Sequence, residues 1–552
     1  MVTKVSLILV FLAIFSINFK AYTEVDDQND HNNDPPLTNS EYTNCLNFDA
    51  LPCLNSCCDK KAKSSEPTRL NKEEDKDDAI STKPHRRSVK LHLKRRPIKD
   101  RNEPKTHVLD STIKDLVRIQ TLHRKVLVKN NINNMSRVKE VKEQLQQQIK
   151  PVNASVESLE SSEDEFSGKI MATLESGASL GSGEYFIDMF VGTPPKHVCL
   201  ILDTGSDLTW IQCVPCYDCF EQNGFRYDPK DSSSYRNITC HDPLCQLVSS
   251  LDPLQPCKVE NQTCPYFYGY ADGSNTRGDF ALETFTVNLT WPNGKENFKH
   301  VVDVMFGCGH WNTGFFHGAA GLLGLGRGPL SFSTQMQSIY GNSFSYCLTD
   351  LFSNTSVSSK LIFGEDKELL YHPNLNFTSL LAREESPYDT FYYLGIKSIL
   401  VGGEMLDIPE QTWHWSSEGD GGTIIDSGST LTFSPGQAYD VIKEAFMKKI
   451  KLHPIAEDGF IMSPCYNVSG ALLQVELPDF GIHFADGAVW NFPVENYFYH
   501  YESDEVLCLA ILKSPNHSSL TIIGNLLQQN FHILYDTKKS RLGYSPRRCA
   551  EV

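Results

Sequence analysis

The chain has 552 residues, with 68 acidic and 51 basic side chains and a formal net charge of −17 at pH 7. The acidic excess lies in residues 168–552, which hold 43 Asp/Glu against 24 Lys/Arg, so no nucleic-acid partner is expected. Beyond the N-terminus no stretch approaches the ~20 apolar residues of a membrane span, which argues against a membrane anchor.

The N-terminus has the pattern of a secretory signal. Lys4 precedes an apolar run from Val5 to Ile17, and Ala21 suits the cleavage position, so residues 1–21 are predicted to be a signal peptide. An N-terminal anchor is the alternative. Seventeen cysteines favour the oxidising secretory pathway. We expect an extracellular location (apoplast or cell wall) in preference to the vacuole.

Residues 22–167 do not have the composition of a globular core and are predicted to be a propeptide and linker. Residues 60–150 hold 25 Lys/Arg against 12 Asp/Glu, and a loose apolar stripe predicts one helix over about 110–129. In a secreted chain, this basic segment is expected to bind the acidic remainder and cover its cleft, in preference to acting as a nucleic-acid arm. No role follows for the four early cysteines, Cys45, Cys53, Cys57 and Cys58.

From residue 168 onward, short apolar runs alternate with Gly, Pro and Asn, which predicts a mainly β fold. The exception is an amphipathic helix over about 434–451. Two of the apolar runs end in similar tripeptides, Asp203-Thr204-Gly205 and Asp426-Ser427-Gly428, each followed by a serine. Two carboxylates that meet in a dry cleft cannot both ionise, so they share a proton and supply an acid and a base together.

A second element follows each aspartate tripeptide, and this order is the internal repeat of the chain. Gly321-Leu322-Leu323-Gly324-Leu325-Gly326 follows the first and Thr521-Ile522-Ile523-Gly524-Asn525 follows the second. An apolar pair before Gly suits a strand beside the aspartate loop, where a missing side chain lets two backbones pass closely. The glycine cluster at 324–328 lacks the Lys-Ser/Thr of a phosphate-binding loop and is interpreted as a turn.

These motifs resemble those of pepsin-type aspartic proteases, and more narrowly of the nepenthesin-like plant group. Trp210 lies seven residues after Asp203, as in the family motif, and 270–274 resembles the flap with Tyr270 as its tyrosine. The resemblance covers residues 168–552. It implies a bilobal fold with a cleft between two β-rich lobes, an N-terminal lobe at 168–380 and a C-terminal lobe at 381–552. It also implies a cysteine-rich insertion at 211–265.

The resemblance also implies residue roles. Asp203 and Asp426 would be catalytic, Thr204 and Ser427 would tie the two loops together, and Tyr270 would close over substrate with its hydroxyl hydrogen-bonded to Trp210. The serines after each glycine would orient the carboxyls. The supporting residues are therefore Thr204, Gly205, Ser206, Ser427, Gly428 and Ser429. No metal or cofactor is expected.

Cysteines and glycosylation sequons form two further sets of candidates. Zinc is an alternative for the Cys213/Cys216 spacing, but secretion favours disulfides. Cys199 is left over as a buried small hydrophobe. The disulfide candidates are Cys213, Cys216, Cys219, Cys240, Cys245, Cys257, Cys264, Cys308, Cys347, Cys465, Cys508 and Cys549. The glycosylation candidates are Asn237, Asn261, Asn288, Asn354, Asn376, Asn467 and Asn516, with Asn134 and Asn153 before residue 168.

The sequence therefore predicts a secreted, monomeric aspartic endopeptidase made as a zymogen, which hydrolyses protein or peptide substrates at acidic pH. Its own propeptide would be an intramolecular inhibitor. The alternative is a catalytically inactive binder or inhibitor of extracellular enzymes with the same fold. A damaged aspartate pair or flap would favour the binder, whereas both features are intact here.

Overall fold

The computed structural model describes most of the chain after residue 182 and a few strands before it. The described residues are 89–92, 169–170, 172–176, 183–248, 259, 261–270, 273–290, 296–314, 316–350, 359–384, 388–416, 419–455, 461–469, 475–501, 505–514 and 519–549. The predicted signal peptide, the helix at 110–129 and the four early cysteines lie outside them, as do Cys257, Asn354 and Asn516. Within these residues, no helix has the length and apolar character needed to cross a membrane.

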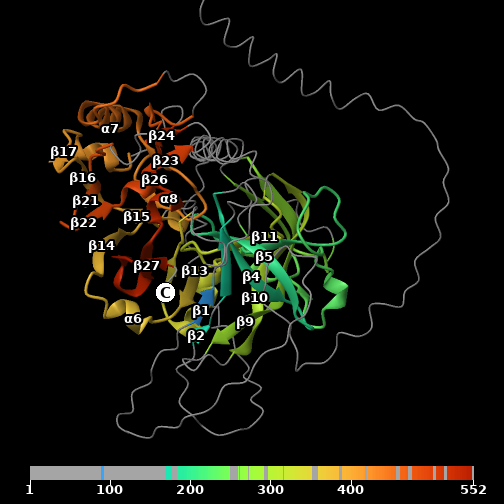
Figure 1. The fold of residues 1–552 in the computed structure, drawn as a ribbon. Coiled ribbons are helices and arrows are strands. Elements are labelled where there is room, and N and C mark those ends of the chain that lie inside the picture. Colours follow the sequence, from blue (N-terminus) through green and yellow to red (C-terminus); the bar gives the residue numbers. More distant parts are fainter. Residues whose placement is uncertain are drawn as a thin grey trace, which may run out of the picture. The chain divides into compact units, whose positions relative to one another are not determined.

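The N-terminal lobe is built mostly from antiparallel strands, with parallel pairs β5–β11 and β6–β10 (Figure 1). Its strands are β2 (Lys169–Ile170), β3 (Ala172–Ser176), β4 (Tyr185–Val191), β5 (Lys196–Asp203), β6 (Trp210–Gln212), β7 (Arg236–Asn237), β8 (Pro265–Gly269), β9 (Asn275–Thr290), β10 (Glu296–Thr313) and β11 (Gly321–Gly324). The last six residues of β5 are all buried, because alternate residues pack into two different hydrophobic clusters, while β4 and β11 pair with its two edges. An apolar run on β5 is therefore the expected pattern for a strand covered on both faces.

A six-stranded antiparallel part of the large sheet joins the two halves of the chain. Its strands follow the order β1 (Val89–His92), β13 (Ser359–Phe363), β12 (Ser343–Cys347), β27 (Phe531–Asp536), β28 (Arg541–Pro546) and β14 (Asn376–Leu381). The central pair, β12 and β27, brings together segments about 190 residues apart. Stacked Phe344 and Tyr535, with ring centroids 4.5 Å apart, fill the space beside this pair.

The C-terminal lobe repeats the aspartate-strand arrangement on smaller sheets. Its strands are β15 (Tyr392–Leu394), β16 (Ile396–Val401), β17 (Glu404–Met405), β18 (Thr423–Ile425), β19 (Thr432–Ser434), β20 (Cys465–Asn467), β21 (Phe480–Phe484), β22 (Val489–Phe492), β23 (Phe498–Tyr501), β24 (Val506–Leu509), β25 (Ile511–Lys513) and β26 (Thr521–Ile523). The mainly β, bilobal fold predicted from the sequence is confirmed.

Helices are few and mostly short in the described residues. The helices are α4 (Phe332–Gln335), α5 (Gln337–Tyr340), α6 (Lys367–Leu370), α7 (Gly436–Lys449) and α8 (Asn525–Gln528), with 3-10 turns at Pro229–Asp231, Pro243–Leu247, Tyr388–Thr390, Glu410–Trp413, Val494–Asn496 and Thr537–Lys539. Helix α7 confirms the predicted helix at 434–451. Its buried residues Ala438, Ile442 and Phe446 recur every four positions and so form one apolar face.

Five disulfides join described cysteines, and one of them, Cys213–Cys308, holds the cysteine-rich insertion to the rest of its lobe. The pairs are Cys213–Cys308, Cys216–Cys219, Cys245–Cys264, Cys347–Cys549 and Cys465–Cys508. Cys213 links the start of the insertion to β10, and Cys264 lies next to the flap strand β8. Because Cys213 and Cys216 are both oxidised, the zinc alternative does not fit this structure.

The prediction for Cys199 is wrong. This residue is buried on β5, as expected, but it is disulfide-bonded, as is Cys240. Neither has its partner among the described residues. The sequence pattern was misleading because an apolar strand predicts only that a thiol is buried. It does not show whether a second cysteine approaches that thiol from elsewhere in the fold.

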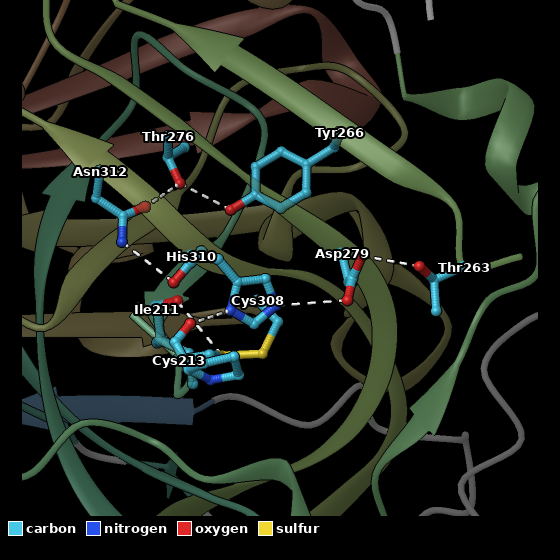
Figure 2. Close-up of polar contacts among 11 residues, drawn as sticks. Ile211, Cys213, Thr263, Tyr266, Thr276, Asp279, Cys308, His310 and Asn312 are labelled. Atoms are coloured by element: carbon cyan, nitrogen blue, oxygen red, sulfur yellow. Dashed lines mark hydrogen bonds and ion pairs between the residues drawn. A yellow bond between two sulfur atoms is a disulfide. The ribbon is translucent and has the colours of Figure 1, made fainter. Parts of the chain in front are cut away.

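The buried side chain of His310 connects the insertion to the flap strand β9. Its ring nitrogen Nδ1 lies 2.8 Å from the carbonyl oxygen of Pro215, and Nε2 lies 3.4 Å from the Asp279 carboxylate. Figure 2 shows Asp279 between His310 and Thr263, whose hydroxyl donates to the other carboxylate oxygen at 2.9 Å. Only the imidazolium form can donate to both the carbonyl and the carboxylate.

The charge state of His310 therefore affects how firmly the insertion is held. Burial by itself lowers the pKa of His310. The hydrogen bond and charge of Asp279 oppose this effect, together with the carbonyl of Pro215, and leave the pKa raised above 6.5. A raised pKa in the folded state means that protonation stabilises the fold. This stabilisation is complete below about pH 6, and it is lost as pH rises through the folded-state pKa.

His310→Gln is expected to lower the free energy of unfolding at pH 5 on the order of 1 kcal/mol, because a charge-assisted contact to Asp279 disappears. Above pH 8 the deficit should shrink, since neutral His310 can no longer donate to both partners. Chemical denaturation at the two pH values measures this. His414→Gln is the control, because its pair with Glu410 is exposed at 4.0 Å. A deficit that does not change with pH would contradict the prediction.

Candidate active site

The two predicted aspartates come together from the two lobes. Asp203 is the last residue of β5, and Asp426 directly follows β18. Each strand runs parallel to the predicted second element: β5 pairs with β11 and β18 pairs with β26. Both carboxyl groups are almost completely buried, with 1% of each residue exposed. The duplicated pattern in the sequence therefore builds two equivalent half-sites.

Each carboxyl accepts the same two local hydrogen bonds. The Gly205 amide donates to Asp203 Oδ1 at 2.9 Å, and the Ser206 hydroxyl donates to Oδ2 at 2.7 Å. In the other lobe, the glycine amide and serine hydroxyl two and three residues after Asp426 make the same bonds at 2.8 and 2.7 Å. Ser206 and Ser429 thus orient the two carboxyls with one geometry.

Thr204 and Ser427 tie the two loops together. The Thr204 amide donates to Ser427 Oγ at 3.0 Å, and the Ser427 amide donates to Thr204 Oγ1 at 2.9 Å. The Ser427 hydroxyl then donates to the carbonyl of Leu202 at 3.1 Å. Both residues are fully buried, so neither amide could exchange its partner for water. This pair of reciprocal bonds fixes the separation of the two aspartate loops.

Glycines let the second elements approach the aspartate loops. A Cβ at Gly324 would lie 2.2 Å from the carbonyl oxygen of Asp207, and one at Gly524 would lie 2.2 Å from that of Leu431. Neither backbone oxygen can move aside without displacing the loop that carries the aspartate. The prediction that both glycines permit close passage of backbones is confirmed.

The flap tyrosine packs against the first half-site. The Trp210 indole donates to the Tyr270 hydroxyl at 2.6 Å, and Tyr270 lies at the end of β8 in the β8–β9 hairpin. Gly273 turns this hairpin with φ +85°, a conformation that favours glycine. Burial raises the pKa of Tyr270 well above 10, and the charges of Tyr268 and Asp203 add to this effect. The phenol therefore stays protonated at any pH that a carboxyl pair would require.

The cysteine-rich insertion also reaches the flap. Phe220 packs edge-on against Trp210 and lies 4.6 Å, centroid to centroid, from Phe316. Phe316 in turn contacts both Trp210 and Tyr270. The Trp210 indole, which supports the flap tyrosine, is therefore enclosed by Phe220 from the insertion and Phe316 from the β10–β11 connection.

Comparison with known proteins assigns a family to this site. The family models described as "Xylanase inhibitor N-terminal" and "Xylanase inhibitor C-terminal" match residues 185–365 and 391–546. Aspartyl protease family protein 2 of Arabidopsis thaliana is 38% identical over 384 residues, which cover 69% of this chain and 74% of that protein. Aspartic proteinase nepenthesin-2 of Nepenthes gracilis is 35% identical, over 68% of this chain and 80% of its own length. The chain belongs to the pepsin-type aspartic protease family, in its nepenthesin-like plant group.

Solved structures show the same fold for this nepenthesin-like chain at lower identity. The structure titled "Crystal structure of edgp" matches with a TM-score of 0.56 and 21% identity, over 69% of this chain and 95% of that one. Conglutin gamma from lupine seeds matches with a TM-score of 0.53 and 20% identity, over 68% and 94%. These similarities extend to the fold and carry no information about activity.

Sequence reasoning missed the roles of two residues that hold the loops of this nepenthesin-like site. Asp207 accepts from the Gly328 amide at 2.8 Å and from the Thr390 hydroxyl at 2.7 Å, so it joins the first loop to a residue of the second half of the chain. Asn525 donates from Nδ2 to the Ser427 carbonyl at 2.9 Å. Both residues adjoin recognised motifs, but their partners are distant in sequence and gave no signal.

The remaining sequence-predicted residues lie away from the aspartates. Asn237, Asn261, Asn376 and Asn467 are exposed, which is compatible with glycosylation, and the side chain of Asn288 lies outside the described part. Occupancy of these sequons stays a prediction, as do the catalytic roles of the site residues.

Thr204→Val and Ser427→Ala are each expected to lower the free energy of unfolding by about 1–3 kcal/mol, because each leaves a buried amide of the opposite loop without an acceptor. The double variant should lose less than the sum, since the second bond cannot keep its geometry once the first is broken. Denaturant unfolding of the full cycle measures the coupling. Thr204→Val combined with Ser514→Ala, a buried serine bonded to the Leu520 carbonyl, should be additive. Additivity in the Thr204/Ser427 cycle would contradict the expected coupling between the two reciprocal hydrogen bonds.

Proposed function

We propose that the protein is an aspartic endopeptidase that hydrolyses peptide bonds at acidic pH through the Asp203/Asp426 pair. The observation that carries this proposal is the symmetric site: two buried carboxyls, each oriented by one glycine amide and one serine hydroxyl, on loops tied by reciprocal hydrogen bonds. A fold that served only for binding would not require matched carboxyls in a buried position.

The chemistry needs a basic water and an activated carbonyl at the same time. Of two neighbouring buried carboxyls, one stays protonated while the other ionises, because two like charges at short range are strongly unfavourable. The ionised carboxylate takes a proton from a water molecule held between the pair, while the carboxylic acid donates to the scissile carbonyl. The titration belongs to the pair of carboxyls, so neither Asp203 nor Asp426 is assigned as the protonated one.

The flap supplies closure over the substrate. Tyr270 is held by Trp210 in this structure, and a protonated phenol can keep that bond while the hairpin closes. Closure would exclude water and strengthen each electrostatic interaction in the cleft. The aromatic residues around Trp210 give the substrate side of the flap a rigid support.

A binder without activity is the second candidate, because the matched family models are described as xylanase inhibitor domains. Basic 7S globulin from soybean also shares the fold, at a TM-score of 0.52 and 18% identity. Relatives with higher identity carry the names of aspartic proteases. Together with the intact aspartate pair and flap, these relatives support the enzyme.

Asp203→Asn and Asp426→Asn are each expected to lower kcat/KM by roughly a thousandfold or more, because an amide can neither take a proton from water nor share one. The assay is cleavage of a denatured protein or quenched peptide by the activated enzyme, with an optimum below about pH 5. Pepstatin, whose statine hydroxyl mimics the hydrated peptide bond, should block it. Absence of cleavage at every pH in the wild-type protein would favour the binder.

We also propose that the protein is secreted as a monomeric zymogen and acts on protein substrates outside the cell. Strand β1, from the predicted propeptide, adds to the edge of the sheet that joins the lobes by pairing with β13 over four residues. Backbone pairing of this kind gives a propeptide a defined position, and its basic charge favours the acidic remainder of the chain. Protonation of surface carboxylates near pH 4 would weaken that attraction.

Purified full-length protein is expected to shorten and gain activity when the pH is lowered to about 4. Asp203→Asn protein should stay at full length, because it cannot cleave itself or its neighbours. Gel analysis and N-terminal sequencing over a pH series measure the outcome. Wild-type protein that remains inactive at full length in acid, yet becomes active after cleavage by another protease, would refute self-activation without refuting the enzyme.

A further inference from the structure

We propose that Tyr268 and Asp207 are positioning residues that hold the flap in place over the substrate. The Asp207 amide donates to the Tyr268 hydroxyl at 3.2 Å, and the Asp207 carboxylate accepts from groups of two other segments. We call these residues the loop junction: Asp207, Tyr268, Gly328 and Thr390. The inference rests on the proposed function and concerns how the flap of that same site is positioned.

The flap makes two hydrogen bonds to the segment that follows the first aspartate. Tyr268 lies on β8 and Tyr270 directly follows this strand, so their side chains lie on the same face, with ring centroids 5.3 Å apart. The Trp210 indole donates to Tyr270 at 2.6 Å, and the Asp207 amide donates to Tyr268. Both phenol oxygens are acceptors in these bonds, because an indole N–H and a backbone amide can only donate. The flap is therefore attached at two points.

The bond to Tyr268 reaches the backbone of the aspartate loop. Asp207 directly follows Ser206, whose hydroxyl donates to Asp203 Oδ2 at 2.7 Å. A side-chain donor can change its rotamer, whereas a backbone amide moves only together with its loop. The position of β8 is thereby tied to the loop that carries the first carboxyl.

The Asp207 side chain fixes that loop to a glycine-rich turn. Its Oδ1 accepts from the Gly328 amide at 2.8 Å, and its Oδ2 accepts from the Thr390 hydroxyl at 2.7 Å. A Cβ at Gly326 or at Gly328 would collide with the oxygens of this carboxylate, so a side chain at either position would displace it from its donors. The glycine cluster at 324–328 is therefore more than a turn, because it leaves the space that the Asp207 carboxylate occupies.

Thr390 extends the connection to the second half-site. It lies two residues before Tyr392, the first residue of β15, and Tyr392 pairs with Ile425 on the strand that leads into Asp426. The Tyr392 hydroxyl lies 2.8 and 3.1 Å from two carbonyl oxygens of the 324–328 turn. The loop junction thus links the flap strand to the loop of one aspartate and to the neighbouring strand of the other.

This arrangement predicts an effect on substrate binding. A flap covers the substrate both in the bound state and in the transition state, so a correctly placed flap stabilises the two equally and lowers KM. The bonds that orient the Asp203 carboxyl come from Gly205 and Ser206 and do not involve Tyr268. Loss of the Tyr268 bond should therefore leave the chemical step and its pH dependence unchanged.

Tyr268→Phe tests the proposal, since it removes the acceptor of the Asp207 amide and keeps the aromatic ring. In activated enzyme acting on a quenched peptide, KM should rise about fivefold while kcat stays within about twofold. The pH profile of kcat should superimpose on that of the wild type. An unchanged KM would overturn the inference, as would a fall in kcat at constant KM, because the residue would then act on the carboxyl pair.

Thr390→Val provides the second variant, because it removes the hydroxyl bonded to Asp207 Oδ2 and preserves the shape of the side chain. KM should rise by about two- to fivefold. Since both residues act through Asp207, the double variant with Tyr268→Phe should raise KM by less than the product of the two single effects. A Thr390→Val enzyme with wild-type KM, or effects that multiply fully, would overturn the connection through Asp207.

The matched control is Tyr497→Phe. This phenol donates to the Pro478 carbonyl at 2.9 Å in the C-terminal lobe, so its loss should lower thermal stability and leave KM unchanged. An equal rise of KM in the control would overturn the inference, because general loosening of the fold would then explain the effect. Wild-type protein without peptidase activity at any pH would refute the proposed function instead, so the two failures are distinguishable.

Discussion

The reciprocal hydrogen bonds between Thr204 and Ser427 are the constraint on which the rest of the site depends. They lie in a fully buried position, where an amide without an acceptor would carry the whole cost of its lost hydration. Two chain segments 223 residues apart are thereby held at one separation. The aspartates, the orienting serines and the second elements are all placed relative to this contact, so it defines the geometry in which two carboxyls can share a proton.

Around this contact the molecule is symmetric in what touches the carboxyls and asymmetric in what supports the loops. The glycine amide and the serine hydroxyl are the same in both half-sites. The carbonyl of Asp203 is held by a strand partner, whereas that of Asp426 is held by Gln528. The two carboxyls need equivalent hydrogen bonds if they are to share one proton.

The cysteine-rich insertion is connected to the flap by three kinds of interaction. A disulfide joins Cys213 to β10, His310 bridges Pro215 and Asp279, and Phe220 packs on Trp210. Each of them involves a residue that adjoins the flap hairpin or its supporting tryptophan. The insertion thereby extends the rigid support behind Tyr270, and protonation of His310 tightens that support under the acidic conditions in which the proposed enzyme would act.

The sequence by itself determined the mainly β class, helix α7, both aspartate loops and their parallel partner strands. These features repeat in local patterns: an apolar run, a turn tripeptide and a glycine where two backbones meet. Only the tertiary structure decided that Cys199 is oxidised, that Thr390 reaches Asp207, and that Tyr346 bonds to both Tyr535 and Gln528. A local apolar pattern can predict that a side chain is buried. It cannot predict which hydroxyl meets which, because that depends on how β12 and β27, about 190 residues apart, align in one sheet.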